Sequence, residues 1–272
     1  MNCDDIIDII VKFIHDIVSD AYLSKVVVGL SGGIDSSVSA ALAVRALEVN
    51  NVIGIMMPRK IGGVYDSGYK DAVEFAKSLG IHYVTVPLEN YLRDPPKRNF
   101  LNTEQLQNEQ LLNGNIAARM RMIILYDQAA RRRALVMGTT NKTELMLGYY
   151  TKYGDGGVDF EPLAGIYKTE IIRIAKHIGI PDNIVNKPPS ADLWEGQTDE
   201  EELGVTYKDA DKILWQLVEE RNFPDDLRKN LKKLTGIEDK DILNRVHTLI
   251  TKNKHKRHVP PTADVLEILC RR

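Results

Sequence analysis

The stretch Val26–Ser37, "VVVGLSGGIDSS", decides the fold of this chain. An apolar run passes through two adjacent glycines into residues with a helical pattern, which predicts a buried parallel strand, a tight turn and a helix. The strand is expected to end at Leu30, and the helix to begin near Asp35 or Ser36. The unpaired amides at the start of such a helix form a site for an anion such as phosphate.

Asp35 is the unusual residue of this loop. The loop lacks the Gly-Lys-Ser/Thr that closes a Walker A motif, and it lacks the Gly-x-Gly-x-x-Gly spacing of a dinucleotide-binding turn. A carboxylate beside the expected anion site would repel a phosphate unless a cation lay between them. Mg²⁺ fits, because it bridges carboxylate and phosphate oxygens. The local sequence also permits a simpler interpretation, in which Asp35 only caps the helix.

Three more apolar runs follow along the chain. They begin at Asn51 ("NVIGIMM"), His82 ("HYVTVPL") and Ala134 ("ALVMGT"). Short, continuous apolar runs of this kind are typical of parallel strands that are covered on both faces. We therefore expect four strands in one mainly parallel sheet.

Helical patterns alternate with these runs. Apolar residues recur at helical spacing over Ile6–Val18, an alanine-rich run starts at Ser36, and a third segment starts at Asp71 and would be capped by Gly80. From Tyr207 onward the pattern is helical throughout. The chain is therefore predicted to be an α/β protein: a doubly wound, mainly parallel sheet flanked by helices, with a helical C-terminal part.

Composition narrows the class of protein. The 272 residues suit one domain, and 36 basic against 38 acidic side chains argue against a general nucleic-acid binder. Cys3 and Cys270 form no Cys-x-x-Cys pair, so neither a disulfide framework nor a zinc site is expected. The acidic start and the lack of a long apolar run predict a cytoplasmic protein with no membrane partner.

Three irregular stretches and a basic tail remain. The stretches begin at Arg59, Gly148 and Asn186, and long irregular segments in compact enzymes often carry ligands. Near the C-terminus no Asp or Glu occurs between Asp241 and Asp264, whereas "TKNKHKRH" carries several Lys and Arg. The tail is either a solvated surface or a clamp for an anion.

"SGGIDS" at Ser31–Ser36 resembles the signature of the ATP pyrophosphatases, in which this loop holds the pyrophosphate of ATP. Within that group the chain is similar to the ammonia-dependent NAD+ synthetases. The similarity runs from the glycine loop to the basic tail and includes "NGNIAARMRM" at 113–122, "GTTNKTE" at 138–144, "YYTKYGDGGVDFEPL" at 149–163, "IYKTEI" at 166–171, "KPPSADLWEGQTDEEELG" at 187–204 and "HKRHVPP" at 255–261.

The resemblance implies a reaction in two steps. The nicotinate carboxylate of deamido-NAD+ attacks the α-phosphorus of ATP and releases pyrophosphate, and ammonia then displaces AMP to give NAD+. ATP is a cosubstrate and Mg²⁺ a cofactor. Most of the protein's task is then positioning and charge stabilisation.

The resemblance also implies roles for individual residues. Asp35 and Glu144 match magnesium ligands and, with Lys168, the catalytic positions. The residues that match contacts to ATP are Gly29, Leu30, Ser31, Gly32, Gly33, Ile34, Asp35, Ser36, Thr139, Lys168 and Ser190. Those that match contacts to deamido-NAD+ are Arg119, Lys152, Asp159, His255 and Lys256.

Several positions have a simpler explanation. Glu144 lies three residues after Asn141 and could merely support the first turn of a helix. Asp155–Gly157 is a tight-turn signal, to which we assign backbone geometry and no chemistry. Charged residues on a helix from Asn115 usually face water, and only the resemblance selects Arg119. The acidic cluster Asp199–Glu202 is expected to be a solvated loop.

The resemblance implies partners as well. We expect no glutaminase domain, so the nitrogen donor is free ammonia or ammonia from a separate protein. Relatives are homodimers, and Ile6–Val18 and Asn115–Arg132 are the candidate pairing helices. The basic tail is expected to order when substrate binds. Two other functions stay open: another adenylating enzyme, such as a free-standing GMP synthetase ATP domain, and a nucleotide sensor without catalysis.

Overall fold

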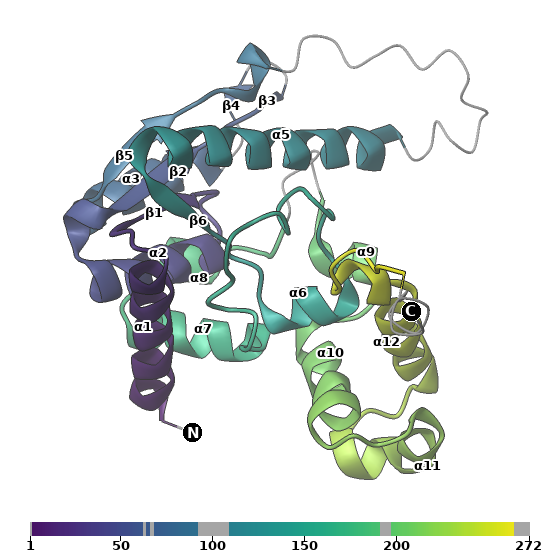
Figure 1. Cartoon of the computed structure of the whole chain (residues 1–272). Helices are drawn as coiled ribbons and strands as arrows, with labels where there is room; N and C mark the ends of the chain where they lie inside the picture. Colours follow the sequence, from purple (N-terminus) through teal and green to yellow (C-terminus); the bar gives the residue numbers. More distant parts are fainter. Residues whose placement is uncertain (1, 62–63, 66–67, 92–108, 191–196, 264–272) are drawn as a thin grey trace, which may run out of the picture.

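The computed structural model describes residues 2–61, 64–65, 68–91, 109–190 and 197–263. At its centre lies a four-stranded parallel sheet (Figure 1). Its strands are β1 (Lys25–Gly29), β2 (Val52–Met56), β5 (His82–Thr85) and β6 (Ala134–Met137). Each strand lies within one of the four predicted apolar runs, so these predictions are confirmed.

The order of the strands determines where a ligand can bind. The order is β5-β2-β1-β6, so the chain moves outward from β1 through β2 to β5 and then returns to the other side of β1. Val28 of β1 pairs with Met137 of β6, which brings the carboxyl ends of these two strands together. Doubly wound sheets bind ligands at this point of reversal. The glycine loop follows one of the two strands, and Thr139 follows the other.

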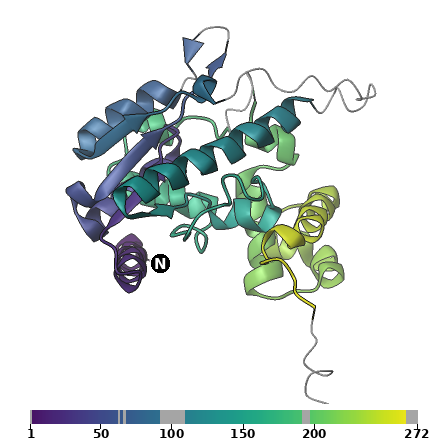
Figure 2. The same ribbon diagram turned by 45° about the horizontal axis from the view of Figure 1, so that its top comes forward.

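Helices cover both faces of the sheet (Figures 1 and 2). On one face, α1 (Cys3–Asp20), α2 (Ile34–Leu47), α3 (Gly68–Leu79) and α7 (Lys168–His177) share a core with Val26 and Val28. On the other face, α5 (Glu109–Arg132) packs on Val27. Successive strand residues point to opposite faces, and both faces are apolar, as the sequence predicts. The doubly wound α/β fold is confirmed.

The C-terminal part is helical, as predicted. Its elements are α9 (Asp199–Leu203), α10 (Tyr207–Leu214), a π-helical turn (Trp215–Glu219), α11 (Pro224–Thr235), α12 (Lys240–Lys252) and a 3-10 turn (Lys254–Lys256), and α6 (Lys142–Leu147) packs with them. These helices have an apolar core of their own, made by Leu147, Leu203, Ala210, Leu214, Leu227, Leu231, Leu243 and Val246, among others. They lie beside the sheet and extend away from it (Figure 1). The short helix α8 (Asp182–Val185) belongs instead to the core that α1, α2, α3 and α7 share with the sheet.

Some boundaries differ from the predicted ones. α5 begins at Glu109, before the expected Asn115, and the strand before the glycine loop ends at Gly29. Gly80 ends α3 with φ of +71°, which confirms its capping role. The remaining short elements are a 3-10 turn (Val49–Asn51), the hairpin strands β3 (Lys60–Ile61) and β4 (Val64–Tyr65), and a 3-10 turn (Leu88–Asn90). Cys270 and the positions 62–63, 66–67 and 191–196 of the irregular stretches lie outside the described residues.

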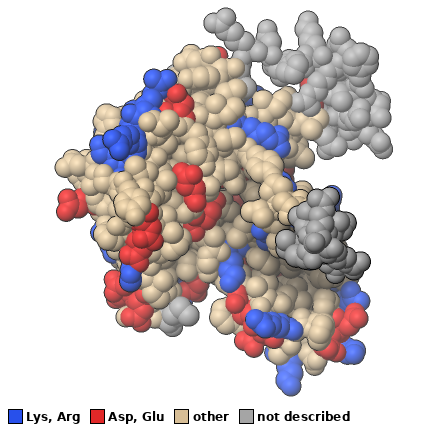
Figure 3. All heavy atoms as spheres, in the orientation of Figure 1, with Lys and Arg blue, Asp and Glu red and all other residues tan. Residues whose placement is uncertain are grey.

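On the face shown in Figure 3, the described basic side chains lie in separate groups among acidic ones. Among the described residues, no helix combines the length and the apolar character required to cross a bilayer.

Candidate active site

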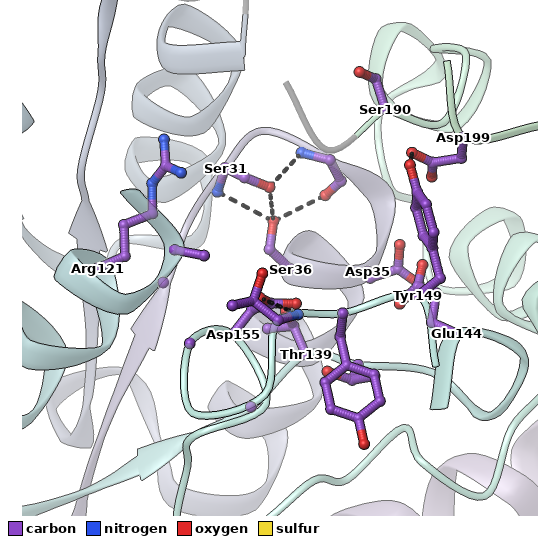
Figure 4. A pocket seen from close by; sticks show the side chains of 18 of the residues that line it. Ser31, Asp35, Ser36, Arg121, Thr139, Glu144, Tyr149, Asp155, Ser190 and Asp199 are labelled. Atoms are coloured by element: carbon purple, nitrogen blue, oxygen red, sulfur yellow. Dashed lines mark hydrogen bonds between the residues drawn. The ribbon is translucent and has the colours of Figure 1, made fainter. Parts of the chain in front are cut away.

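A cavity of about 480 Å³ lies at the point where the strand order reverses. The loops after β1 and β6 form its floor, and residues from α5, α6, α9 and the chain before α7 line its walls. Figure 4 shows Arg121 on one side of the glycine loop and Ser190, Asp199 and Tyr149 on the other. Side chains from distant parts of the sequence therefore face one space.

The glycine loop is held in a conformation that favours glycine. Gly32 has φ of +78°, and a Cβ atom there would lie 2.2 Å from the carbonyl oxygen of Gly68. Ser36 Oγ donates to the carbonyl of Gly33 at 3.0 Å and lies 3.2 Å from Ser31 Oγ (Figure 4). Gly33 is the N-cap of α2 and offers no side-chain cap, so the first amides of α2 are available to an anion.

Asp35 does not cap its own helix. Its Oδ1 accepts a hydrogen bond of 2.9 Å from Asn141 Nδ2, and its Oδ2 is ion-paired to the ammonium of Lys168. The simpler interpretation of Asp35 as a helix cap is therefore wrong. This carboxylate joins the loop after β1 to the loop after β6 and to α7.

Lys168 lies between two carboxylates. Its side chain is 3% exposed, and its Nζ lies 3.2 Å from Glu144 Oε1 while also contacting Asp35. Burial alone would lower the pKa of Lys168, but the charges of Asp35 and Glu144 outweigh burial and raise it, so the ammonium stays protonated. The ring of Tyr207 lies 5.0 Å from the same nitrogen.

Glu144 supports the first turn of α6, as the simpler interpretation expects, and it also faces Lys168. Its backbone N–H donates to Asn141 Oδ1 at 3.0 Å, and its Oε2 accepts from the backbone N–H of Asn141, which is a capping box. Its Oε1 is the partner of Lys168. Burial raises the pKa of Glu144 to about 7. The positive charge of Lys168 lowers the pKa of this carboxyl group but offsets the effect of burial only in part.

The acidic cluster at Asp199–Glu202 is not a solvated loop, so that expectation is wrong. The residues form α9, and Asp199 is buried and accepts hydrogen bonds from Tyr207 at 2.8 Å and from Tyr149 at 3.1 Å. Glu202 accepts from Tyr149 as well, and both acids line the cavity. No signal within α9 shows this burial, because Tyr149 lies 50 residues away in the sequence and Tyr207, eight residues away, belongs to the next helix.

Most residues predicted to bind ATP lie together. The cavity is lined by Gly29, Leu30, Ser31, Gly33, Ile34, Asp35, Ser36, Thr139, Glu144, Lys168 and Ser190. Gly32 belongs to the same loop but lines no part of the cavity wall.

The residues predicted to bind deamido-NAD+ fall into two groups. Lys256 lines the cavity and donates to the carbonyls of Gly148 at 2.6 Å and Tyr150 at 2.8 Å, and Lys152 donates to the carbonyl of His255 at 3.0 Å. Arg257 donates to the carbonyl of Met146 at 2.7 Å, so these bonds tie the basic tail to residues 146–152; that the tail orders when substrate binds stays a prediction.

Arg119 and Asp159 form the second group; like Lys152 and His255 of the first group, they do not line this cavity. Both are exposed. Asp159 accepts hydrogen bonds from Tyr126 Oη at 3.1 Å and from the backbone N–H of Val136 at 2.7 Å.

Two cavity residues were assigned no chemistry from the sequence. Arg121, two positions after Arg119 on α5, lines the cavity, and only the phase of the helix could have distinguished the two arginines. Asp155 also lines the cavity, where its Oδ1 accepts from the backbone N–H of Thr151 at 2.9 Å. The turn at Asp155–Gly157 therefore contributes the Asp155 side chain to the cavity wall in addition to its backbone conformation.

The donor set fits Mg²⁺. Among the described residues, no group of three or more His, Cys, Asp or Glu side chains is arranged to hold a metal. Asp35 and Glu144 offer two carboxylates at the cavity wall beside the amides of α2. Mg²⁺ is usually bound in this way, by one or two carboxylates together with substrate phosphates.

A sequence model of one family, described as NAD synthase, matches residues 6–260. The chain belongs to the NAD synthase family. The NH(3)-dependent NAD(+) synthetase of Methanocaldococcus jannaschii is 42% identical over 96% of this chain and 97% of that protein. The protein of the same name from Archaeoglobus fulgidus is 38% identical over 99% of this chain and 100% of its own length.

Solved structures of NAD synthase relatives have the same fold. The NH3-dependent NAD synthetase of Campylobacter jejuni, in complex with nitrate, aligns with a TM-score of 0.76 at 30% identity and covers 97% of this chain and 100% of its own. The NMN synthetase of Francisella tularensis aligns with a TM-score of 0.77, also at 30% identity, over 97% of this chain and 99% of its own.

Proposed function

We propose that this NAD synthase family member is an ammonia-dependent NAD+ synthetase, a ligase that amidates deamido-NAD+ with ammonia at the expense of ATP. One observation carries the proposal: Lys168 pairs with Asp35 and Glu144 directly beside the uncapped start of α2. An anion site next to two carboxylates is what ATP with Mg²⁺ requires, and a simple nucleotide sensor needs no such acidic pair.

The main-chain amides of the glycine loop would hold the pyrophosphate of ATP. The amides at the start of α2 and the helix dipole favour negative charge there, and the Ser31 and Ser36 hydroxyls lie at the same place. Charge grows on the pyrophosphate as it leaves the α-phosphorus. Fixed donors that face this charge lower the barrier because they need no reorganisation.

Lys168 would supply positive charge to the same region. Because its ammonium is already bound to Asp35 and Glu144, its position is fixed before ATP arrives. Asp35 and Glu144 would hold Mg²⁺, which supplies charge neutralisation of the phosphates when bound. The adenylated nicotinate then has AMP as leaving group, and ammonia displaces it to form the amide.

The split between the two groups of deamido-NAD+ residues supports a homodimer. Arg119 and Asp159 lie away from the cavity that contains Lys256. Next to Asp159, Phe160 stacks edge-to-face on Phe13 of α1, with ring centroids 6.1 Å apart, and Tyr126 of α5 donates to Asp159.

Exposed apolar side chains continue this surface. Ile9 on α1 and Ile123 on α5 are exposed, as are parts of Phe13 and Tyr126. We propose that α1 and α5 pair with a second copy of the chain, so that Arg119 and Asp159 serve a substrate site near the interface. Light scattering should give a dimer, and the double variant I9E/I123E should be a monomer; a monomeric wild type at working concentration would refute the pairing.

A product assay tests the function. Purified protein is incubated with ATP, Mg²⁺ and deamido-NAD+, with and without ammonium, and the nucleotides are identified by chromatography. AMP, pyrophosphate and NAD+ are expected in equal amounts when ammonium is present. Binding of ATP without turnover would instead support a sensor. Turnover with xanthosine monophosphate as the acceptor, but not with deamido-NAD+, would support a GMP synthetase.

A second acceptor belongs in the same assay. The structural relative from Francisella tularensis is named an NMN synthetase, so nicotinate mononucleotide is the competing acceptor. A higher kcat/KM for the mononucleotide than for deamido-NAD+ would change the proposed product to nicotinamide mononucleotide. The residues that hold ATP would keep their roles in either case.

The metal role has its own test. Asp35→Asn keeps the shape and the contact with Asn141 but removes the charge. Turnover should fall by roughly 10²–10³-fold, the loss typical of one transition-state electrostatic contact. A near-normal rate, or an unchanged dependence on Mg²⁺ concentration, would contradict the role of Asp35 as a ligand.

A further inference from the structure

Asp211 is a buried carboxylate that no step of the proposed reaction uses. It lies on α10, in the helical C-terminal part, and its residue is 5% exposed. A buried carboxylate is unfavourable unless its oxygens accept hydrogen bonds. Its bonding partners therefore indicate why a charge is kept at this position.

Within the described part of the chain, the hydrogen bonds to Asp211 come from two other helices. Oδ1 accepts from Thr143 Oγ1 on α6, and Oδ2 accepts from Thr169 on α7, through the backbone N–H at 2.9 Å and Oγ1 at 2.8 Å. Thr143 Oγ1 in turn accepts from the backbone N–H of Lys168 at 2.9 Å. Asp211 thus binds the first turn of α7 both directly and through α6.

These bonds replace a missing cap. The N-cap of α7 is Tyr167, which makes no side-chain capping bond, so the first amides of this helix have no partner within it. The amides of Lys168 and Thr169 are satisfied instead by Thr143 and Asp211. The cap of α7 therefore comes from α6 and α10.

The residues joined in this way adjoin the catalytic pair. Thr143 precedes Glu144 on α6, and Thr169 follows Lys168 on α7. The 3.2 Å contact between Lys168 Nζ and Glu144 Oε1 depends on the relative position of these two helix starts. One carboxylate holds both helix starts at once.

We infer that Asp211 is a positioning residue, which fixes Lys168 against Glu144 by holding the first turns of α6 and α7 together. The inference rests on the proposed function for its kinetic consequence only. Asp211 touches none of the cavity walls and would contact no substrate. Its effect on turnover passes through Lys168.

The kinetic test compares Asp211→Ala and Asp211→Asn with a control on the same helix. Asp209 forms a reciprocal hydrogen-bonded cap with Thr206 at the start of α10 and contacts neither α6 nor α7 in the described structure, so Asp209→Ala weakens α10 alone. We expect kcat to fall roughly 10–100-fold in Asp211→Ala, as small misplacements of catalytic groups do. Asn, which keeps one acceptor oxygen, should give an intermediate value.

The other kinetic constants discriminate positioning from general damage. The KM for deamido-NAD+ should stay within about twofold, because Lys152, His255 and Lys256 are not bonded to Asp211. Asp209→Ala should have normal kcat. In a Lys168→Met background, Asp211→Ala should add no further loss of turnover. Equal kcat in wild type and Asp211→Ala, or equal losses in the Asp209 control, would overturn the inference.

A measurement that needs no activity completes the test. Amide hydrogen exchange at Lys168 and Thr169, followed by NMR on the full chain, should be at least tenfold faster in Asp211→Ala than in wild type and unchanged in Asp209→Ala. Unaltered exchange would overturn the inference even if the enzyme is active. If wild type proves inactive on every acceptor, the proposed function fails while this experiment still decides the role of Asp211. Thr143→Val removes two bonds, the one to Asp211 and the one from the backbone N–H of Lys168, and serves if Asp211→Ala does not fold.

Discussion

Replacing Lys168 with methionine tests the electrostatic centre of the cavity. Methionine keeps the length of the side chain and removes its charge. Asp35 and Glu144, whose side chains are 17% and 16% exposed, would then face each other without the ammonium between them. Removing one partner of a buried ion pair lowers stability by about 3–5 kcal/mol, because the remaining charge is left uncompensated.

The lower end of that range applies here, because both carboxylates keep some contact with solvent. A loss of about 3 kcal/mol in the free energy of unfolding corresponds to a decrease in Tm of roughly 6–12 °C for a protein of this size. Calorimetry at pH 7.5 without nucleotide measures it. Turnover with ATP, deamido-NAD+ and ammonium should fall by roughly 10²-fold or more, because in the proposed function Lys168 would act on the developing charge of the pyrophosphate.

Lys142 provides a matched control. It is also ion-paired, to Glu219, and it also lies 5.0 Å from a tyrosine ring, that of Tyr167. Its pair is more exposed, at 20% and 32% for the two side chains, so Lys142→Met should lower stability by less than about 1 kcal/mol. If Lys168→Met lowered Tm no more than Lys142→Met does, the account of a buried charge centre would be refuted.

Three further predictions follow from single contacts. Gly32→Ala should abolish tight ATP binding in calorimetric titration and destabilise the fold by at least roughly 1–2 kcal/mol, because φ of Gly32 is +78° and the new Cβ would meet the Gly68 carbonyl. A normal affinity of the variant for ATP would contradict this prediction. Burial raises the pKa of Glu161 to about 8, above that of an unfolded glutamate, so the free energy of unfolding of the wild type should fall from pH 5 to 8 by up to about 1 kcal/mol per pH unit. Urea melts measure this slope. A Glu161→Gln variant with the same slope would show the assignment to Glu161 to be wrong. Lys256→Met should raise hydrogen exchange at 254–257 and the KM for deamido-NAD+, because it loses both carbonyl bonds; unchanged exchange would mean that other contacts anchor the tail.

The parts of the fold that the sequence predicts are those with local signals. The four apolar runs, the amphipathic α1 and the glycine turn each carry their pattern within a few residues, and all are present in the structure. The residues proposed to bind ATP came from the resemblance, and the sheet order places most of them in one cavity by bringing the loops after β1 and β6 together.

The residues that were missed depend on partners in other elements of the structure. Asp199 is buried by Tyr149 and Tyr207, and Asp211 is bonded to Thr143 and Thr169. Nothing within α9 or α10 distinguishes these acids from solvated ones, because the energy of a buried carboxylate depends on donors from other helices.

The close contact between the glycine loop and Gly68 limits how this protein can vary. A Cβ atom on Gly32 would strike the carbonyl of Gly68, and a Cβ atom on Gly68 would lie 2.1 Å from the carbonyl of Ser31. In each case the obstructing atom is a backbone carbonyl oxygen, which no substitution of the opposing residue removes. A genetic search for suppressors of either change should therefore return true revertants at this contact, and a randomised library for altered substrate choice should leave both positions fixed.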